Sequence, residues 1–582
     1  MTTVSRAAGA RPTLGALRRS WLGLALLALL LLLVVVPLGR IVLVTLTAEG
    51  LEAWRDVLWG RLSGALFYEP LLSTLVVGAC VAFGTTLLGG FLAWLVVLTD
   101  VPGRGLLGTL ASLPFVIPSF ATALAWSVLF RNDRVGAQGG LLQELGFSVP
   151  DFLAWGAVPV VLVLITHYYS LSYSLIAAGL ASVSADLLEA GEMAGADRFR
   201  VLRGVTLPLV MPAVVAGAVL TFASAVSNFA VPALLGLPVR YHTLSTRLYG
   251  MISTGQLERG YVLSVLLIAV SAALLWYGNR LRSGRRSFAT ITGKGGRTKR
   301  FALGRLRWPL FAVAFTLCLL TAVIPGLTLL ASSFAAQKGS LLSGFTTHFW
   351  VGVSTPGIAE GQAGVLRNPQ IVDALLTTLG LGVAVAAVAT LLGLLIGYAV
   401  SKHRGSWLAG ALGQLAYTPI LVPGIAFGAA YIALFAGPLG PLPALYGTFA
   451  LLVIAGAAYA LPFAAQSGQA ALAQVAGELE ESARLTGARL PRRLWGIFLP
   501  LSARGLLAGG VLVFVKIVRD LSLVVLLYTP ATPLLSVVAF RYASEGFVQF
   551  ANAITVIIAL VSVVTTLLAA RLGRRSGRWS QT

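Results

Sequence analysis

The chain has few charged residues, very few acidic ones and almost no cysteine. Only 11% of its 582 residues are charged, 20 residues are Asp or Glu, and Cys80 and Cys318 are its two cysteines. Both cysteines lie in apolar runs, where a thiol packs as a small apolar group, so no disulfide framework is predicted. No cluster of His, Cys, Asp and Glu has metal-ligand spacing, and we therefore predict no metal site.

The sequence also has no phosphate-binding loop and no visible catalytic constellation. Gly-x-x-x-x-Gly-Lys-[Ser/Thr] does not occur, and Gly293-Lys294-Gly295 has the wrong spacing for it. No segment is long and polar enough to form a separate soluble domain that holds a nucleotide. We therefore expect no catalytic residue, no enzymatic activity and no cofactor in this chain.

Long apolar runs dominate instead, because 57% of the residues are hydrophobic. A helix needs roughly 20 apolar residues to cross the hydrocarbon core of a membrane. About twelve runs satisfy this requirement, at residues 21–46, 70–99, 106–130, 153–181, 209–236, 261–279, 308–333, 374–400, 406–434, 441–467, 501–528 and 550–571. The first run is too long for a signal peptide and lacks a clear cleavage site, so we interpret it as a retained span. The sequence predicts an all-α integral membrane protein.

The net charge of +22 does not indicate nucleic-acid binding, because the basic residues are placed as expected for the topology of a membrane protein. Basic residues gather before the first span, in the linker 280–307 and after the last span. An even number of spans separates these three segments, so they lie on one side, which the positive-inside rule makes cytoplasmic. We expect both termini in the cytoplasm and contacts of the linker with membrane lipid.

One stretch of the sequence occurs twice, 292 positions apart, without insertion. The copies share the following landmarks: Glu189-Ala190-Gly191, Gly195 and Leu207-Pro208 in the first, and Glu481-Ser482-Ala483, Gly487 and Leu499-Pro500 in the second. Both copies (182–208 and 470–500) fall on the predicted cytoplasmic side, so the repeats are parallel. We predict two homologous halves of six spans, 1–279 and 308–582, joined by the linker.

The repeated stretch has the pattern of a short exposed helix, a bend and a rigid entry into the next span. Leu187, Ala190 with Gly191, and Ala194 share one helical face, and the copy presents Leu479, Ser482 with Ala483, and Thr486. The glycines Gly195 and Gly487 favour a sharp turn, and the Leu-Pro pair suits the first turn of a span. Both helices are acidic, which favours a protein partner over the alternative of an amphipathic helix lying on lipid.

Polar residues inside predicted spans mark a candidate pathway across the membrane. Span 501–528 carries Lys516, Arg519 and Asp520, and the 292 offset places Ser224, Ser227 and Asn228 at the same level of span 209–236. Lys516 and Asp520 are four residues apart and are predicted to pair on one helix face. A structural ion pair in a contact between helices is an equal alternative to a role in the pathway. His167 belongs to a second polar patch. A lone histidine inside a membrane is more often a hydrogen-bonded packing residue than a metal ligand. Pro114 with Pro118, and Pro419 with Pro423, predict matching kinks around a shared cavity.

The doubled stretch resembles the signature loop of permease subunits of binding-protein-dependent ABC importers. This resemblance covers nearly the whole chain, as two fused type I permease halves, and looks most like the iron(III) transporter branch. It implies that both loops are coupling helices, each seated on one copy of an ATP-hydrolysing subunit that carries ATP and Mg²⁺. It also implies a periplasmic or lipid-anchored solute-binding protein and a place in the bacterial inner membrane.

Other functions fit parts of the sequence. Thiamine and 2-aminoethylphosphonate permeases share the architecture, so the substrate is open among these solutes and iron(III). An ion-coupled secondary transporter would also have twelve spans in two halves, with Lys516 and Asp520 relaying protons, but the repeated acidic helices would have no role. A non-transporting scaffold would leave the paired prolines and intramembrane charges unexplained.

Overall fold

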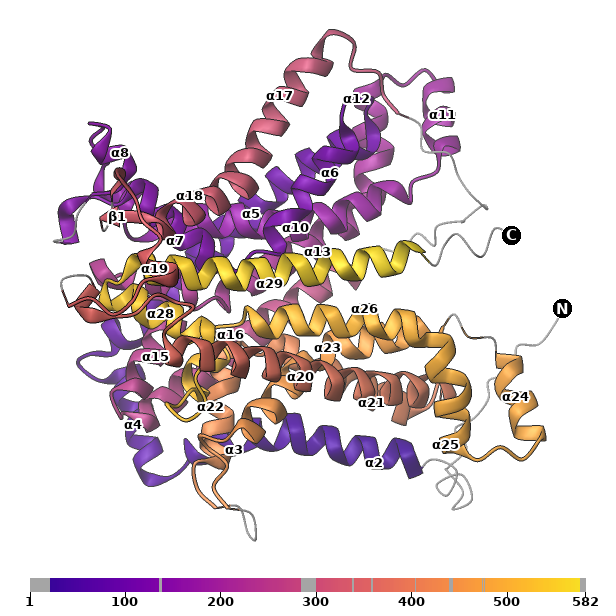
Figure 1. The fold of residues 1–582 in the computed structure, drawn as a ribbon. Coiled ribbons are helices and arrows are strands. Elements are labelled where there is room, and N and C mark those ends of the chain that lie inside the picture. Colours follow the sequence, from indigo (N-terminus) through magenta and orange to yellow (C-terminus); the bar gives the residue numbers. More distant parts are fainter. Residues whose placement is uncertain are drawn as a thin grey trace.

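The structure, a computed structural model, describes residues 21–135, 139–283, 300–337, 340–356, 359–403, 405–438, 443–473, 475 and 477–575. The described chain is almost entirely helical (Figure 1). The one named pair of strands in these residues is antiparallel, β1 (Ala335–Gln337) with β2 (Ser340–Phe345). The basic residues before the first span, at 285–299 and after Arg575 lie outside the described residues.

Within the described residues, ten helical segments are long and apolar enough to cross a membrane, and two bent helix pairs bring the number to 12. In the first half the spans contain α2 (Trp21–Leu30) with α3 (Val36–Val44), α5 (Glu69–Leu98), α6 (Arg104–Ser112) with α7 (Ser119–Phe130), α10 (Ala157–Ala181), α13 (Leu207–Val226) and α16 (Leu257–Ser283). In the second half they contain α17 (Arg307–Cys318) with α18 (Ile324–Ser333), α20 (Pro369–Lys402), α21 (Trp407–Tyr417) with α22 (Gly424–Phe435), α23 (Phe449–Leu472), α26 (Leu499–Val518) and α29 (Val548–Arg575). The predicted all-α membrane fold is confirmed.

Shorter helices lie between the spans or at their ends. They are α4 (Ala48–Trp59), α8 (Leu141–Glu144), α9 (Asp151–Ala154), α11 (Ala185–Met193), α12 (Arg198–Val201), α14 (Ala230–Leu235) and α15 (Leu244–Ser253) in the first half, and α19 (His348–Val351), α24 (Gly477–Leu485), α25 (Leu490–Arg493), α27 (Val524–Leu527) and α28 (Leu535–Glu545) in the second.

In the part of the chain that the structure describes, five helices contain a π turn, and each π turn ends two residues before a proline. The turns are Leu31–Val35, Gly64–Tyr68, Leu202–Thr206, Leu319–Val323 and Leu494–Phe498, before Pro37, Pro70, Pro208, Pro325 and Pro500. A proline lacks the amide proton and crowds the carbonyl four residues back. The wider turn lets the preceding residue donate five residues back instead, as Leu207 does to the Leu202 carbonyl.

These π turns correct the predicted role of the Leu-Pro pairs. The sequence placed Pro208 and Pro500 in the first turns of spans beginning at 209 and 501. The helices instead begin at Arg198 and Leu490 and pass through both prolines. They also end earlier than predicted, at Val226 and Val518, rather than continuing to 236 and 528.

The paired prolines break their spans completely. The helix containing Pro114 and the one that follows Pro118 meet at 96°, and the corresponding helices of the second half meet at 108°. Each break is thus far sharper than the kink predicted from the sequence, because the two prolines together remove consecutive turns of helix hydrogen bonds. Pro118 and Pro423, which lie at the breaks, are buried.

The two halves repeat their internal contacts. A β-carbon on Gly78 would lie 2.9 Å from the ring of Phe222, and one on Gly382 would lie 2.8 Å from the ring of Phe514. Thr74 accepts a hydrogen bond from the Leu244 amide at 2.9 Å. Its counterpart Thr378 accepts one from the Leu535 amide at 2.9 Å. The halves are therefore similar in three dimensions as well as in sequence.

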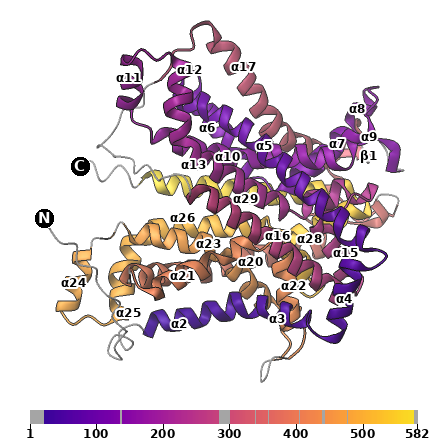
Figure 2. The same cartoon turned by 180° about the vertical axis from the view of Figure 1, so that it is seen from behind.

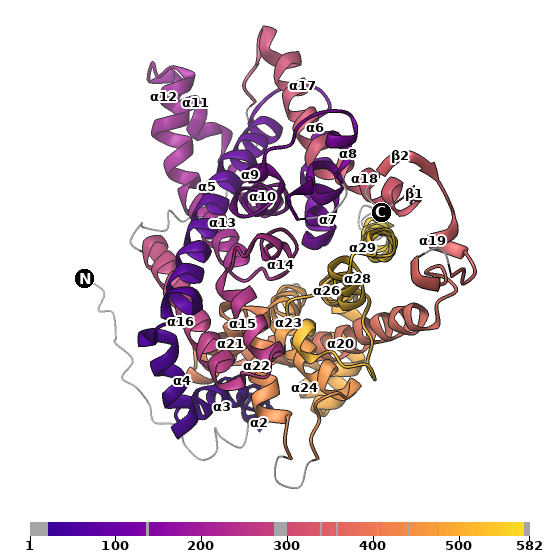
Figure 3. The same ribbon diagram turned by 90° about the vertical axis from the view of Figure 1, so that its left-hand side faces the viewer.

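The leading span of each half packs against the other half. The Tyr431 hydroxyl of α22 donates to the Leu33 carbonyl at 2.7 Å, and the Tyr169 and Thr321 hydroxyls of α10 and the α17–α18 span are 3.0 Å apart. The views from front, back and end show α2 beside α21, and α17 with α18 beside α6 and α7 (Figures 1, 2 and 3). The packing of each leading span against the other half joins the two halves, and the sequence did not predict it.

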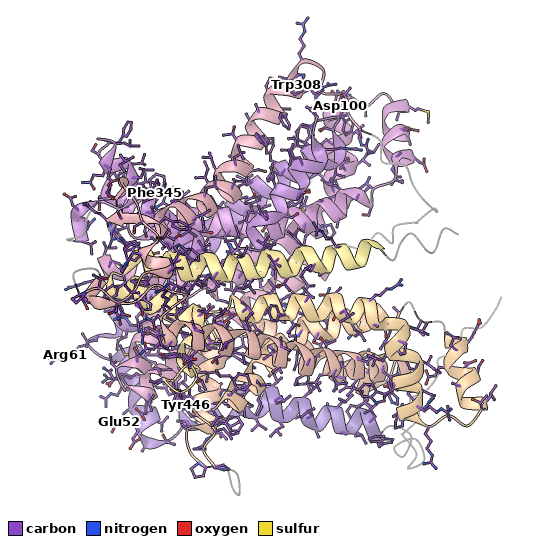
Figure 4. All side chains as sticks on the ribbon, in the orientation of Figure 1. Glu52, Arg61, Asp100, Trp308, Phe345 and Tyr446 are labelled. Carbon is purple, nitrogen blue, oxygen red and sulfur yellow. The ribbon has the colours of Figure 1, made fainter. Side chains whose placement is uncertain are left out.

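The end of the linker is held by the first half. The Phe301 amide donates to the Leu98 carbonyl at 2.7 Å, the Asp100 amide donates to the Phe301 carbonyl at 3.2 Å, and the Asp100 carboxylate accepts from the Leu303 amide at 2.8 Å. These bonds direct the chain into α17 on the surface of the first half. Asp100 and Trp308 lie at one end of the molecule, and Phe345, Glu52 and Arg61 lie at the other (Figure 4).

Candidate functional site

Two polar side chains cap the backbone where α13 and α26 end. The Asn228 Oδ1 accepts a hydrogen bond from the Val231 amide at 3.0 Å, and the Asp520 Oδ1 accepts one from the Leu523 amide at 2.8 Å. Both residues follow the last turn of a helix and are 292 positions apart. The halves therefore use one local geometry at this level, with an amide in one and a carboxylate in the other.

Asn228 also connects three helices of the first half. Its Nδ2 donates to the Ser119 Oγ and to the Tyr168 Oη, each at 3.0 Å. Ser119 is the first residue of α7, directly after the break at Pro118, so the broken span reaches the end of α13. His167 lies against the Tyr168 ring, with the ring centroids 4.8 Å apart, and its Nδ1 has no hydrogen-bond partner.

The two basic residues near the end of α26 lie over aromatic rings. The Lys516 Nζ is 3.6 Å from the centroid of the Tyr459 ring and 5.2 Å from that of Phe463. The Arg519 Cζ is 4.5 Å from the centroid of the Phe115 ring, which belongs to the first half. Cation–π contacts of this kind stabilise a cation without neutralising it. Tyr459 occupies the position of His167 in the second half, so the same level is polar in both halves.

The predicted pairing of Lys516 with Asp520 is not formed. Helix α26 ends at Val518, so the two residues do not share a helix face. Among the ion pairs of the described residues none joins them. The carboxylate is engaged by the Leu523 amide, whereas the ammonium group faces the Tyr459 ring. The structure brings Asn228, His167, Lys516, Arg519 and Asp520 to one region, which we call the polar ring together with Tyr168 and Tyr459.

Three aromatic rings from both halves lie next to the polar ring. The Phe229 ring is 4.8 Å from that of Tyr249 and 5.5 Å from that of Phe540, and the last two are 6.3 Å apart. Tyr249 and Phe540 each come five residues after the residue whose amide donates to Thr74 or Thr378, so they are counterparts. Counterparts that touch lie on the axis relating the halves. We call Phe229, Tyr249 and Phe540 the aromatic seal.

The repeated stretches form exposed helices with matching turns. Gly195 and Gly487 have φ of +82° and +75°, the left-handed conformation predicted for them. The amides of Ala196 and Ala488 each donate five residues back, to Gly191 and Ala483, which closes both helices in the same way. Helices α11 and α24 lie apart from each other at one end of the molecule (Figure 1).

The sequence predicted that both small residues of each pair lie on one shared face of α11 or α24, and the structure agrees only in part. Glu189, Ala190, Glu481 and Ser482 are exposed, whereas Gly191 packs against Val201 and Ala483 is buried, so one residue of each small pair faces inward. Large apolar side chains at matching positions are also exposed: Leu187 (49%) and Leu479 (47%), and Met193 (85%) and Leu485 (89%). Gly195 and Gly487 are exposed at the turn, and Leu207, Pro208, Leu499 and Pro500 lie on the helices that follow.

An ion pair holds α24 to the membrane helices of the second half. The Glu480 Oε1 accepts a hydrogen bond from Arg493 Nη1 at 3.0 Å and one from the Tyr398 hydroxyl at 2.8 Å. At the positions of Glu480 and Arg493 the first half has the buried residues Leu188 and Val201. From the sequence, an exposed acidic helix was expected here, whereas Glu480 is engaged in an ion pair. The feature of the sequence that indicates this pair is the basic residue thirteen positions later, which occurs in one copy only.

Replacing Arg493 by alanine is expected to loosen α24 selectively. The side chains of Arg493 and Glu480 are only 9% and 18% exposed, so removal of one partner leaves an unpaired charge, at a cost of about 3 kcal/mol. Limited proteolysis near residue 485 and thermal unfolding measure the effect. The exposed neighbour provides the control, because Glu481→Gln is expected to change stability by less than about 0.5 kcal/mol. Equal shifts for both variants would contradict the anchoring role.

Comparisons with known proteins agree with this arrangement. Residues 85–282 and 389–578 match the family described as binding-protein-dependent transport system inner membrane component, once in each half. A probable ABC transporter permease protein of Sinorhizobium fredii is 25% identical over 497 residues, 83% of each chain. A molybdenum transport system permease protein of Escherichia coli K12 is 28% identical over 38% of this chain and 97% of its own length. A ferric transport system permease protein of Actinobacillus pleuropneumoniae is 24% identical over 75% of this chain and 61% of its own length.

Proposed function

This chain belongs to the binding-protein-dependent transport system inner membrane components and is a fused, two-repeat ABC transporter permease, and we propose that it imports a small solute into the cytoplasm. ATP hydrolysis by a separate subunit drives the import, and a periplasmic or lipid-anchored binding protein delivers the solute. The observation that carries the proposal is the pair of matching exposed helices, α11 and α24, on one end of a two-half membrane domain.

We propose that α11 and α24 are coupling helices that dock on two copies of the ATPase subunit. Leu187 and Met193, and their counterparts Leu479 and Leu485, expose large apolar side chains next to acidic ones. Apolar anchors inside a polar rim are typical of protein interfaces. The ion pair between Glu480 and Arg493 transmits a displacement of α24 to the membrane helices. The packing of Gly191 against Val201, and the burial of Leu188 in the same apolar cluster as Val201, do so for α11.

At the other end, we propose that the loops 237–260 and 334–373 receive the binding protein. The strand pair β1–β2 lies in the second loop, and its exposed Phe345 extends from that end (Figure 4). The Glu144 carboxylate of the α7–α10 connection accepts a hydrogen bond from the Leu341 amide at 3.1 Å. This bond fixes the strand pair to the first half, so both halves contribute to the receiving surface.

Iron(III) is the first candidate substrate, because the chain resembles the iron(III) branch and a ferric permease covers most of it. The relative named for molybdenum, and the resemblance to thiamine and 2-aminoethylphosphonate permeases, keep other solutes open. The polar ring is the part of the pathway that a solute would meet between the halves. Its residues Asn228, His167, Lys516, Arg519 and Asp520, together with the neighbouring Ser227, are therefore proposed to line the pathway.

Uptake into proteoliposomes tests this function. The chain is reconstituted with its ATPase, with the binding protein on one side and ATP on the other, and offered iron(III), molybdate, thiamine and 2-aminoethylphosphonate in turn. We expect accumulation of one solute that requires both ATP and the binding protein. Uptake driven by an ion gradient without ATP would instead support the secondary transporter.

A further inference from the structure

The polar ring contains more positive than negative charge. Lys516 and Arg519 are cations and Asp520 is the one acidic residue of the ring, so the ring carries a net positive charge. Lys516, Arg519 and Asp520 are half-buried. A charge inside a membrane protein is costly to desolvate, and it normally has a partner of opposite charge or faces water.

The positive groups form no direct ion pair within the described residues. Lys516 and Arg519 lie over the rings of Tyr459 and Phe115 instead, and the Asp520 carboxylate accepts a hydrogen bond from the Leu523 amide. The Arg519 Nη1 and the His167 Nδ1 are buried without any hydrogen-bond partner. Buried polar atoms of this kind are rare in folded proteins and call for an explanation.

We propose that the polar ring is a transient binding site for an anionic solute, held between the halves by Lys516 and Arg519. This inference rests on the proposed import function and names the chemical class of the substrate: an oxyanion, such as a phosphonate or molybdate, or an anionic complex. An anion supplies the missing opposite charge and the missing acceptor for the Arg519 guanidinium, whose planar fork suits such oxygens.

The position of the ring fits a site on the route and not a structural contact. Its members come from both halves, with Asn228 in the first and Arg519 in the second, and Arg519 lies on Phe115 of the first half. The aromatic seal adjoins it through Phe229, which directly follows Asn228, and closes the contact between the halves there. An anion that passes the seal therefore reaches Lys516 and Arg519 next. A bare Fe³⁺ ion would meet charge of its own sign, so iron would pass only as an anionic complex.

Thiol labelling measures the charge preference of this site without any knowledge of the substrate. In a background with Cys80→Ser and Cys318→Ala, Ser227→Cys introduces one thiol next to Asn228, at the position of the first half that corresponds to Arg519. The full-length chain in lipid nanodiscs is treated with the anionic sulfonatoethyl or the cationic trimethylammonioethyl methanethiosulfonate. Each labelling rate is divided by the rate at which the same reagent reacts with 2-mercaptoethanol. This ratio corrects for the different intrinsic reactivities of the two reagents.

We expect the corrected rate for the anionic reagent to exceed that for the cationic one by about tenfold, because a cleft lined by one sign of charge concentrates counter-ions. Lys516→Gln and Arg519→Gln should each bring the ratio toward one. Asp520→Asn should raise the ratio, and Asn228 shows that an amide can make the same backbone cap. Millimolar molybdate or 2-aminoethylphosphonate should slow the labelling.

Several results would overturn the proposal. They are a ratio near one, a preference for the cationic reagent, no labelling by either reagent, or no response to Asp520→Asn in a chain that elutes as a single species. Because the labelling needs neither ATPase nor binding protein, its outcome is independent of the coupling experiments. Full uptake by the Glu189→Lys, Glu481→Lys variant without any need for ATP, together with an intact anion preference, would refute the ATP-driven import and leave an anion site in a different transporter.

Discussion

Uptake is expected to fall by about a hundredfold, to background, when Glu189 and Glu481 are both replaced by lysine. The two residues are exposed at the same position of α11 and α24, and both helices carry further acidic side chains. A surface complementary to an acidic helix is repelled by the new lysines, and like charges across an interface cost several kcal/mol. About 3 kcal/mol in total corresponds to the hundredfold effect. The measurement is ATP-dependent uptake with the variant inserted at normal levels.

A matched glutamine pair separates charge reversal from loss of the side chain. Glu189→Gln with Glu481→Gln keeps the shape and hydrogen-bonding capacity of both residues, so uptake should stay within about threefold of the parent protein. Each single lysine variant should lose about tenfold, because only one docking site is damaged. Full uptake by the double lysine variant would remove the coupling role of these helices.

Crosslinking the aromatic seal is expected to stop uptake completely and reversibly. Tyr249 and Phe540 touch at the axis between the halves, with ring centroids 6.3 Å apart, so the halves must separate there for a solute to pass. Cysteines are placed at both positions in the background Cys80→Ser, Cys318→Ala. A short bis-methanethiosulfonate reagent then joins the halves. Uptake should drop to background and return after reduction with dithiothreitol.

The two single-cysteine variants are the controls for this experiment. They react with the same reagent but cannot link the halves, so their uptake should change by less than about twofold, as expected for a modification that adds little bulk at one side of the contact. A crosslinked protein that transports at the parent rate would show that the solute does not pass between these rings. The pathway would then have to lie elsewhere in the molecule.

The sequence predicted the parts of the fold that depend on local patterns. The long apolar runs predicted the spans, and the repeat with its constant offset predicted the two halves. Gly195 and Gly487 were predicted to turn sharply and adopt positive φ in the structure. These features follow from hydrophobicity, spacing and backbone sterics, which act over a few residues and can be read from one chain.

The remaining features depend on contacts between distant residues. The packing of each leading span against the other half rests on pairs such as Tyr431 with Leu33, which no local pattern reveals. Lys516 and Asp520 have helical spacing, but α26 ends between them, because Asp520 caps the segment that follows. The aromatic seal was missed because its counterparts, Tyr249 and Phe540, are offset by 291 positions and not 292. Glu480 looked exposed because its partners are distant in sequence.

The stoichiometry of the purified assembly tests the central claim most directly. The tagged chain is extracted gently from its native membrane and analysed by native mass spectrometry, with hydrolysis of ATP measured on the same sample. The account predicts one permease chain with two copies of an ATPase, whose hydrolysis rises when the binding protein and its solute are added. A chain that elutes alone, and that transports its solute without ATP, would contradict it.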